Sequence, residues 1–288
     1  MSHFWMMSSD FCQFTTKTAT YLTRLMSNEL YLYRDQMNRE LRLAMRPTRI
    51  VSLVPSISEL LFDIGVEDRV VGVTKFCVHP SRWLATKTIV GGTKTLKTEV
   101  ISMLAPDLII GAKEENERDQ IETLTEIAPV FMADVKCIQD ATALIQVIGE
   151  ICGVAETSRR LCNDIQLHLT GLQQKATGKV AYLIWNQPMM CVGSDTYIDS
   201  VLTWMGYENV ASALSGSRYP EITMNVLKSL NPDKIFLSSE PYPFRDKHIS
   251  QFQMDFPNCD VRLVDGEMFS WYGSRMLRIQ IPNEHGSL

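Results

Sequence analysis

The sequence predicts an α/β protein of two Rossmann-like lobes joined by one long, rigid helix, with a ligand cleft between the lobes. Short β-branched runs alternate with segments of helical period in both halves, which is typical of parallel α/β sheets. One amphipathic segment separates the halves, with Leu161, Ile165 and Leu169 spaced for a single helical face. The predicted divisions are an extension over 1–32, a first lobe over 33–153, a connecting helix over 154–177 and a second lobe over 178–288.

The composition argues against several kinds of partner. The chain has 288 residues, a net charge of -5 and no long basic block, so nothing favours binding to nucleic acid. No apolar run approaches the roughly 20 residues that a spanning helix needs, and we expect no membrane insertion. The seven dispersed cysteines suit reduced thiols. The first 32 residues show no secretion signal or lipid-anchor pattern, which predicts a poorly ordered extension. We expect a monomer.

The first half alternates strands with helices. Two short alternating runs over 33–47 predict a hairpin, and the β-branched run over 49–54 predicts a buried strand. The helix that follows has Ser56 as a candidate cap, Glu59 three positions later and Gly65 at its end. The pattern continues with strand 69–74, a helix and then a strand within 96–112, helix 116–127, strand 129–133 and helix 140–153.

The second half repeats this rhythm after the long helix. A strand is predicted over 179–185, helices over 197–207 and 222–231, strands over 234–238 and 261–265, and a final short helix over 271–281. Polar, aromatic and proline residues gather directly after the strands of both halves. Ligands bind beyond the carboxyl ends of the strands in open α/β sheets. We therefore expect the two lobes to turn these ends towards each other around a ligand.

Two stretches of the sequence resemble a known protein family closely enough to identify it. They are "RPTRIVSLVPSISELLFDIGVEDRVVGVTKFCVHP" (46–80) and "VGGTKTLKTEVISMLAPDLII" (90–110). With the long helix after them, they resemble the substrate-binding proteins of ABC importers for cobalamin, haem and ferric siderophores. This family is also described as helical-backbone metal receptors, and the cobalamin-binding branch is the most similar. The resemblance runs from about Tyr33 to Arg278.

The resemblance implies a binding protein rather than an enzyme. It implies a bulky metal chelate held between the lobes, with cobalamin or another corrinoid preferred and haem or a ferric siderophore second. The chelate is the cargo, and no resident cofactor is implied. A periplasmic location follows from the family, although no export signal is visible. The alternative is a cytoplasmic, non-transporting relative that acts as a carrier, sensor or interaction module.

Members of this family that meet an ABC permease use one exposed glutamate in each lobe. Glu99 matches this position in the first lobe. In the second lobe the alignment places Ser270 there, and Glu267 lies three residues away. The missing second glutamate favours the non-transporting alternative.

Aromatic residues after the strands are the leading candidates for ligand contact. Trp185 ends a strand, and Trp271 and Tyr272 begin the last predicted helix. Each is either a flat platform for a macrocycle or a ring that caps the core. Tyr219, in "SGSRYPEIT", is a further candidate.

The stretch "IFLSSEPYPFRDKH" places Tyr242 and Phe244 next to two prolines, with Arg245 following. Proline restricts the backbone and lowers the entropy that a loop loses on binding. The stretch predicts either an aromatic wall of the cleft or a rigid loop that packs on its own lobe.

Charged residues are weaker candidates. Arg218, Arg245 and Arg275 could bind amide or carboxylate groups of a ligand, or remain solvated at the surface. Lys75 and His79 share one loop, where His79 is either an axial nitrogen donor to the ligand's metal or a structural residue beside a proline.

The acidic stretch "KEENER" allows two interpretations. Its acids can favour the start of a helix, or Glu114 and Glu115 can face the cleft, disfavour an anionic siderophore and suit a neutral or cationic ligand. Cys77 and His79 are too few to make a zinc site, so we expect no metal site. The chain has no GxSxG, P-loop or GxGxxG motif, and we expect no catalysis.

Overall fold

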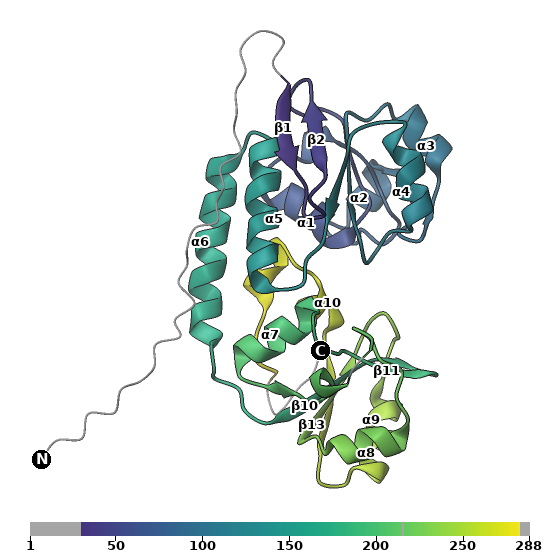
Figure 1. Ribbon diagram of the computed structural model, residues 1–288, viewed down its shortest axis with the longest axis vertical. Coiled ribbons are helices and arrows are strands. Elements are labelled where there is room, and N and C mark those ends of the chain that lie inside the picture. Colours follow the sequence, from purple (N-terminus) through teal and green to yellow (C-terminus); the bar gives the residue numbers. More distant parts are fainter. Residues whose placement is uncertain (1–29, 215, 283–288) are drawn as a thin grey trace, which may run out of the picture.

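The computed structural model describes residues 30–214 and 216–282 of the chain. Two α/β lobes lie one above the other, and helix α6 (Ala155–Leu172) runs along one side of both (Figure 1). Its buried residues, which include Cys162, Ile165 and Leu169, recur every three or four positions and form one apolar face. The predicted fold of two α/β lobes with one long connecting helix is confirmed.

Helix α6 is shorter than predicted. It ends at Leu172 rather than at residue 177, because Gln174 adopts a φ of 54° and turns the chain. The backbone amides of Gln174 and Ala176 then donate to the carbonyl oxygens of Trp204 and Met205, at 3.0 and 2.8 Å. These bonds anchor the end of the helix to the second lobe.

The N-terminal lobe is built on one parallel sheet flanked by helices. Its elements are β1 (Tyr31–Arg34), β2 (Glu40–Leu43), β3 (Ile50–Ser52), α1 (Pro55–Asp63), η1 (Glu67–Arg69), β4 (Val70–Val73), α2 (Trp83–Thr86), β5 (Thr88–Ile89), β6 (Gly91–Gly92), β7 (Thr95–Leu96), α3 (Thr98–Met103), β8 (Leu108–Ala112), α4 (Arg118–Thr125), β9 (Val130–Ala133) and α5 (Ile138–Ile151). The strand order is β5-β4-β3-β8-β9. The chain leaves β3 towards β4 on one side and reaches β8 on the other, so a crevice is expected beyond the ends of β3 and β8.

Two details at the start of this lobe differ from the prediction. Strand β1 begins at Tyr31, inside the extension predicted over 1–32, and the earlier part of that extension lies outside the described residues. Ser56 does not cap α1, because Val54 occupies the cap position and Pro55 is the first helical residue. Proline suits that position, where its fixed φ matches the helix and its missing N–H is not needed.

The C-terminal lobe repeats this arrangement with a mixed sheet. Its elements are β10 (Lys179–Asn186), β11 (Met189–Cys191), α7 (Tyr197–Met205), β12 (Glu208–Asn209), η2 (Val210–Ala213), α8 (Met224–Leu230), β13 (Lys234–Ser238), α9 (Asp246–Asp255), β14 (Asp260–Val264), α10 (Gly266–Ser270) and η3 (Ser274–Arg278). Strands β10, β13 and β14 are parallel neighbours, β11 pairs antiparallel with β10, and β12 also pairs with β10. Strands β10 and β13 thus occupy the places that β3 and β8 hold in the other lobe.

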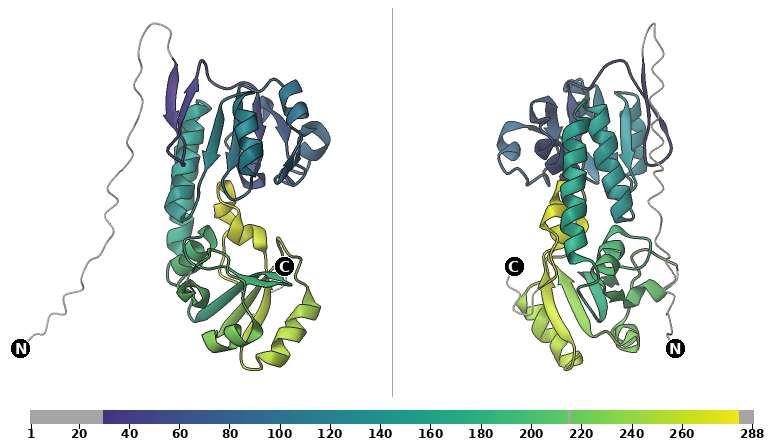
Figure 2. Two further views of the ribbon diagram at one scale, coloured as in Figure 1. Left: turned by 45° about the vertical axis from the view of Figure 1, so that its right-hand side comes forward. Right: turned by 90° about the vertical axis from the view of Figure 1, so that its left-hand side faces the viewer.

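The last part of the chain differs most from the prediction. Instead of one helix over 271–281, the structure has α10 ending at Ser270 and η3 beginning at Ser274, with residues 271–273 between them and a φ of 96° at Gly273. Helix η3 leaves the C-terminal lobe and packs against α1 and α6. Figure 2 shows this segment, coloured yellow, between the two lobes. The second lobe therefore does not extend unbroken to residue 288 as predicted, and the lobes share a second connection.

The apolar core also joins the lobes. One cluster of buried residues includes Leu60 in α1, Ile165 in α6, Tyr182 in β10 and Met276 in η3. A second cluster, around Phe252, fills the other side of the C-terminal sheet. The side of the molecule along α6 is therefore packed, and an opening between the lobes lies on the opposite side. Within the described ranges, no helix combines the length and the hydropathy needed to cross a bilayer.

Candidate functional site

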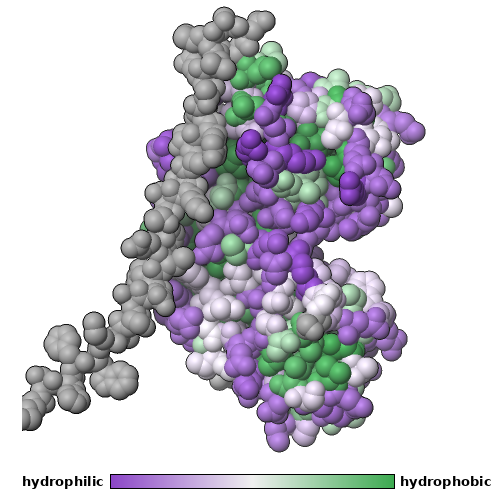
Figure 3. Space-filling model, viewed as in Figure 1, coloured by the Kyte–Doolittle hydropathy of each residue, from purple (hydrophilic) through white to green (hydrophobic). Residues whose placement is uncertain are grey.

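A cavity of about 870 Å³ lies between the lobes, which is within the size range of small-molecule sites. The surface is indented between the lobes on the side away from α6 (Figure 3). Its walls carry Val54, Pro55, Ser56, Phe76, Val78, Thr93, Ala112, Glu114, Glu115, Ala133, Asp134 and Val135 from the first lobe, and Ile184, Trp185, Met190, Tyr197, Ile198, Tyr219, Glu240, Pro241, Glu267, Ser270, Trp271 and Tyr272 from the second.

The cavity wall is formed by the segments that follow the strands of both sheets. In the first lobe, Ser56 follows β3, Phe76 follows β4 and Glu115 follows β8. In the second lobe, Trp185 lies near the end of β10, and Glu240 follows β13. The structure confirms that the carboxyl ends of the two sheets face each other. The crevice beyond β3 and β8 is part of this space, as the winding of the sheet predicts.

Four of the predicted aromatic residues lie on the wall: Trp185, Tyr219, Trp271 and Tyr272. The Trp271 side chain is largely inaccessible, because its Nε1 donates to Glu240 Oε1 at 3.0 Å and the Arg275 guanidinium lies 4.8 Å from its ring centre. Trp185 is 36% exposed, and its ring packs edge-on against Tyr242. Of the two tryptophans on the wall, Trp185 therefore has the more accessible indole ring.

The proline-rich loop packs mainly on its own lobe, which corrects the expectation of an aromatic wall. Phe244 is buried in the C-terminal core and, like Tyr242, is not part of the cavity wall. Tyr242 instead supports Trp185 from behind, with ring centres 5.6 Å apart. Arg245 precedes α9, where its backbone N–H donates to His248 Nδ1 at 2.9 Å. From this loop, the residues that reach the cavity are Glu240 and Pro241.

None of the five predicted cationic contacts lies on the cavity wall: Lys75, His79, Arg218, Arg245 and Arg275. The physical reason is that carboxylates hold three of them. His79 Nε2 lies 2.9 Å from Glu267 Oε2, and Arg218 pairs with Glu114. Arg275 is buried between Glu59 and Glu267. The Lys75 ammonium lies 5.0 Å from the centre of the Phe76 ring. The five side chains are therefore not among the residues that line the cavity.

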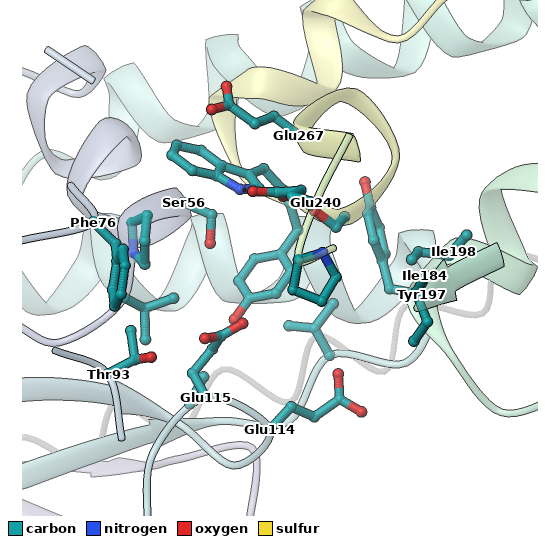
Figure 4. A pocket seen from close by; sticks show the side chains of 18 of the residues that line it. Ser56, Phe76, Thr93, Glu114, Glu115, Ile184, Tyr197, Ile198, Glu240 and Glu267 are labelled. Atoms are coloured by element: carbon teal, nitrogen blue, oxygen red, sulfur yellow. Dashed lines mark hydrogen bonds between the residues drawn. The ribbon is translucent and has the colours of Figure 1, made fainter. Parts of the chain in front are cut away.

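The charged side chains that do line the cavity are all acidic: Glu114, Glu115, Asp134, Glu240 and Glu267. Glu114 and Glu115 come from the first lobe, and Glu240 and Glu267 approach from the opposite side (Figure 4). Burial raises the pKa of Glu114, Glu115 and Glu240, and Arg218 offsets part of this effect at Glu114. Of the two interpretations of "KEENER", the structure therefore supports the one in which Glu114 and Glu115 face the cleft.

Polar contacts cross between the lobes around the cavity. The Tyr219 hydroxyl donates to the Glu114 carboxylate at 3.2 Å, and Lys136 pairs with Asp195 at 3.0 Å. On the other side, His79 meets Glu267. These side chains therefore join the two lobes directly beside the cavity.

A metal ion has no obvious set of ligands here. Among residues 30–214 and 216–282, no group of three or more His, Cys, Asp and Glu side chains could hold one. Cys77 is buried against the hydroxyls of Ser58 and Thr74, and burial raises its pKa. The Nε2 nitrogen of His79 is engaged by Glu267, and His79 is not on the cavity wall, which does not favour a role as an axial ligand.

Comparisons with known proteins agree with this geometry. The family model described as "Periplasmic binding protein" matches residues 50–256. The chain belongs to this family. A vitamin B12-binding protein of Vibrio parahaemolyticus is 24% identical over 219 residues, covering 74% of this chain and 79% of that protein.

Solved structures of periplasmic binding proteins share the fold. The petrobactin-binding protein YclQ of Bacillus subtilis has a TM-score of 0.75 at 15% identity, covering 87% of this chain and 96% of that one. The periplasmic heme-binding protein HutB of Vibrio cholerae has a TM-score of 0.69 at 21% identity, covering 81% and 95%. The resemblance drawn from the sequence is confirmed, and the chain has the two-lobed fold of these structures.

The predicted docking positions can now be placed in the structure. Glu99 is exposed and is the second residue of α3, the helix that directly precedes strand β8. Ser270 is wrong as its counterpart, because its hydroxyl points inward and donates to Glu240 Oε1 at 2.7 Å. Helix α8 precedes β13 as α3 precedes β8, and its second residue is the exposed Asn225. The topological counterpart of Glu99 is therefore an asparagine.

Sequence reasoning missed several wall residues, such as Phe76, Tyr197, Ile198 and Glu240. All of them lie in segments between a strand and the next element, or at the start of a helix after a strand. A position directly after a strand was the signal in the sequence that could have identified these residues. This signal does not distinguish Glu240, which lies on the cavity wall, from Phe244, which lies in the core four residues later. The conformation of the loop decides which of the two side chains faces the cavity.

Proposed function

We propose that this protein binds a bulky metal chelate between its lobes and delivers it to an ABC importer, with a corrinoid as the preferred ligand. The observation that carries the proposal is the cavity of about 870 Å³, walled by aromatic rings from both lobes and without a cluster of metal ligands. Such a cavity suits a ligand that brings its own metal coordination and offers flat apolar surface for stacking. The vitamin B12-binding relatives support the preference for a corrinoid.

A thermal-shift panel on the purified full chain tests this proposal. The panel contains cyanocobalamin, cobinamide, haemin and several ferric siderophores. A ligand present at about a hundred times its dissociation constant stabilises the folded state by about 2.7 kcal/mol. A rise in Tm with one class of chelate supports the proposal, and a flat response to all classes contradicts it.

Trp185 provides a sharper test of the cavity. Trp185→Ala removes the most accessible indole of the wall, and we expect it to weaken chelate binding by about 2–4 kcal/mol, as for other aromatic hot spots. Because the side chain is 36% exposed, the Tm of the ligand-free protein should change little. Tyr31→Ala, which removes a ring of similar exposure on the distant strand β1, serves as the control and should leave the affinity unchanged. Equal affinities for all three proteins would exclude Trp185 from the site.

A non-transporting, cytoplasmic carrier is the second candidate function. The exposed Asn225 at the position that corresponds to Glu99 favours it, since an asparagine cannot form an ion pair with a permease arginine. Fractionation of the native cells separates the two candidates. Recovery of the protein with periplasmic markers supports delivery to an importer, and recovery with the cytosol supports the carrier.

A further inference from the structure

The cavity wall contains five acidic side chains and no lysine, arginine or histidine. Three of the acids have an ion-pair partner, because Glu114 pairs with Arg218, Glu267 with Arg275 and Asp134 with Lys113. In the described part of the chain, no ion pair includes Glu115 or Glu240. Two carboxylates of the described wall therefore face the cavity without an ion-pair partner.

The hydrogen bonds of Glu240 leave acceptor capacity free. Its Oε1 accepts from Ser270 Oγ and Trp271 Nε1, at 2.7 and 3.0 Å, and no hydrogen bond from a described residue reaches its Oε2. A carboxylate offers about four acceptor positions, so capacity for further donors remains. A ligand that fills the cavity displaces the water around these oxygens, and the loss is costly unless the ligand supplies donors or positive charge.

A further polar group on the wall lacks a hydrogen-bond partner. The Tyr197 hydroxyl is buried and makes no hydrogen bond with any described residue, and the residue as a whole is only 4% exposed. Buried polar groups are normally satisfied, so an orphaned one on a cavity wall indicates a missing partner. This observation is independent of the acids and points to a ligand with polar groups at its edge.

The positions of the two unpaired acids indicate how such a ligand is oriented. Glu115 belongs to the N-terminal lobe and Glu240 to the C-terminal lobe, and Figure 4 shows them approaching from opposite sides. They do not converge with other ligands on a single point, as a bare metal ion would require. Donors must therefore be distributed around the periphery of the ligand.

We propose that the cavity selects a metal chelate without net negative charge, whose peripheral amide or ammonium groups donate to Glu115 on one lobe and Glu240 on the other. This inference rests on the proposed function and narrows its ligand class. A chelate with carboxylates at its edge, such as haem with its two propionates, would place like charges against these acids. The two acids thus act as specificity-determining residues.

The test compares two probes on the full chain and on three variants by calorimetric titration. The probes are aqua-cobinamide, whose periphery carries neutral amides, and haemin, whose periphery carries two carboxylates. The variants are Glu115→Gln, Glu240→Gln and, as matched control, Glu117→Gln. Glu117 comes from the same acidic stretch and is not on the cavity wall, and its side chain is 54% exposed.

We expect the unmodified protein to bind cobinamide more tightly than haemin. Each cavity variant should weaken cobinamide binding by roughly ten- to a hundredfold, as for the loss of a hydrogen bond to a charged group. The same variants should bind haemin more tightly, and Glu117→Gln should match the unmodified protein with both probes. Gln keeps the shape and one acceptor oxygen of Glu240, so its bonds from Ser270 and Trp271 can persist.

Failure of this inference differs from failure of the proposed function. If the unmodified protein binds haemin as tightly as cobinamide, and the two cavity variants leave the ratio unchanged, the charge selection is refuted while chelate binding stands. If neither probe nor any siderophore binds, the proposed function itself is refuted.

Discussion

Glu59 and Arg275 lie 216 positions apart and form a buried pair, with two N–O distances of 2.7 and 3.0 Å. Each side chain is about 5–6% exposed. The planar guanidinium matches both carboxylate oxygens at once, which makes such a pair directional as well as strong. Arg275 also contacts Glu267 and the Trp271 ring, so one residue links helix α1 to the wall of the cavity.

Replacing Arg275 should therefore strongly destabilise the protein. Arg275→Met removes both side-chain hydrogen bonds from the buried Glu59 carboxylate, and the loss of one partner costs about 3–5 kcal/mol in comparable buried pairs. The free energy of unfolding from urea titration measures this loss. Arg278→Met is the control, because its side chain is 66% exposed and lies 4.0 Å from the same carboxylate. A change within about 0.5 kcal/mol is expected there, and similar losses in both variants would contradict the assignment.

At the level of elements, the short helix η3 connects the two lobes although it has only five residues. It follows Gly273, whose positive φ of 96° turns the chain out of the C-terminal lobe. Met276 is fully buried in the core that it shares with α1 and α6, whereas the next residue, Leu277, is 39% exposed. The segment thus packs one face against the N-terminal lobe and acts as a second tie between the lobes beside α6.

Truncating Met276 tests this tie. Met276→Ala should cost about 2–5 kcal/mol in the free energy of unfolding, as large-to-small changes in cores do. The neighbouring Leu277→Ala should cost less than about 1 kcal/mol, since much of its side chain is already in water. Equal losses, measured by chemical denaturation, would show that η3 is not packed as described.

At the scale of the whole molecule, two packed connections hold the lobes around a cavity that carries unpaired charge. Unpaired acids in such a site lower the free energy of unfolding at neutral pH, because an acid that is hard to ionise in the folded state disfavours folding there. Burial raises the pKa of Glu115 above its usual value of 4.5, the nearby Glu114 raises it further, and Lys94 offsets part of the shift. The folded protein therefore holds this proton more tightly than the unfolded chain does.

The sign of the pH effect follows from that difference. As the pH rises from about 4.5 through the folded-state pKa of Glu115, the unfolded chain releases its proton first, and stability falls. Glu115→Gln has no such proton, so the ligand-free variant should have the higher Tm at pH 7, with the gap closing towards pH 4.5. Thermal melts across this range measure the gap. A gap that stays constant with pH, or that Glu117→Gln reproduces, would contradict the prediction.

The sequence by itself determined the alternation of strands and helices, the long helix, the family and the placement of the site after the strands. These features depend on local patterns: β-branched runs, helical period and the motif over 46–80. It also singled out Trp185, Tyr219, Trp271 and Tyr272, which the structure brings to one cavity. Periodicity and loop position are properties of neighbouring residues, and a single sequence displays them.

The tertiary structure alone decided which charges face the ligand. Two arginines that the sequence predicted as ligand contacts form ion pairs with carboxylates far away in the chain instead. Arg275 pairs with Glu59, and Arg218 pairs with Glu114. The acids left over, Glu115 and Glu240, set the character of the cavity. Whether two such charged residues form an ion pair depends on the distance between them in the folded protein. No local pattern encodes that distance, since it arises only when α6 and η3 bring the two sheets together.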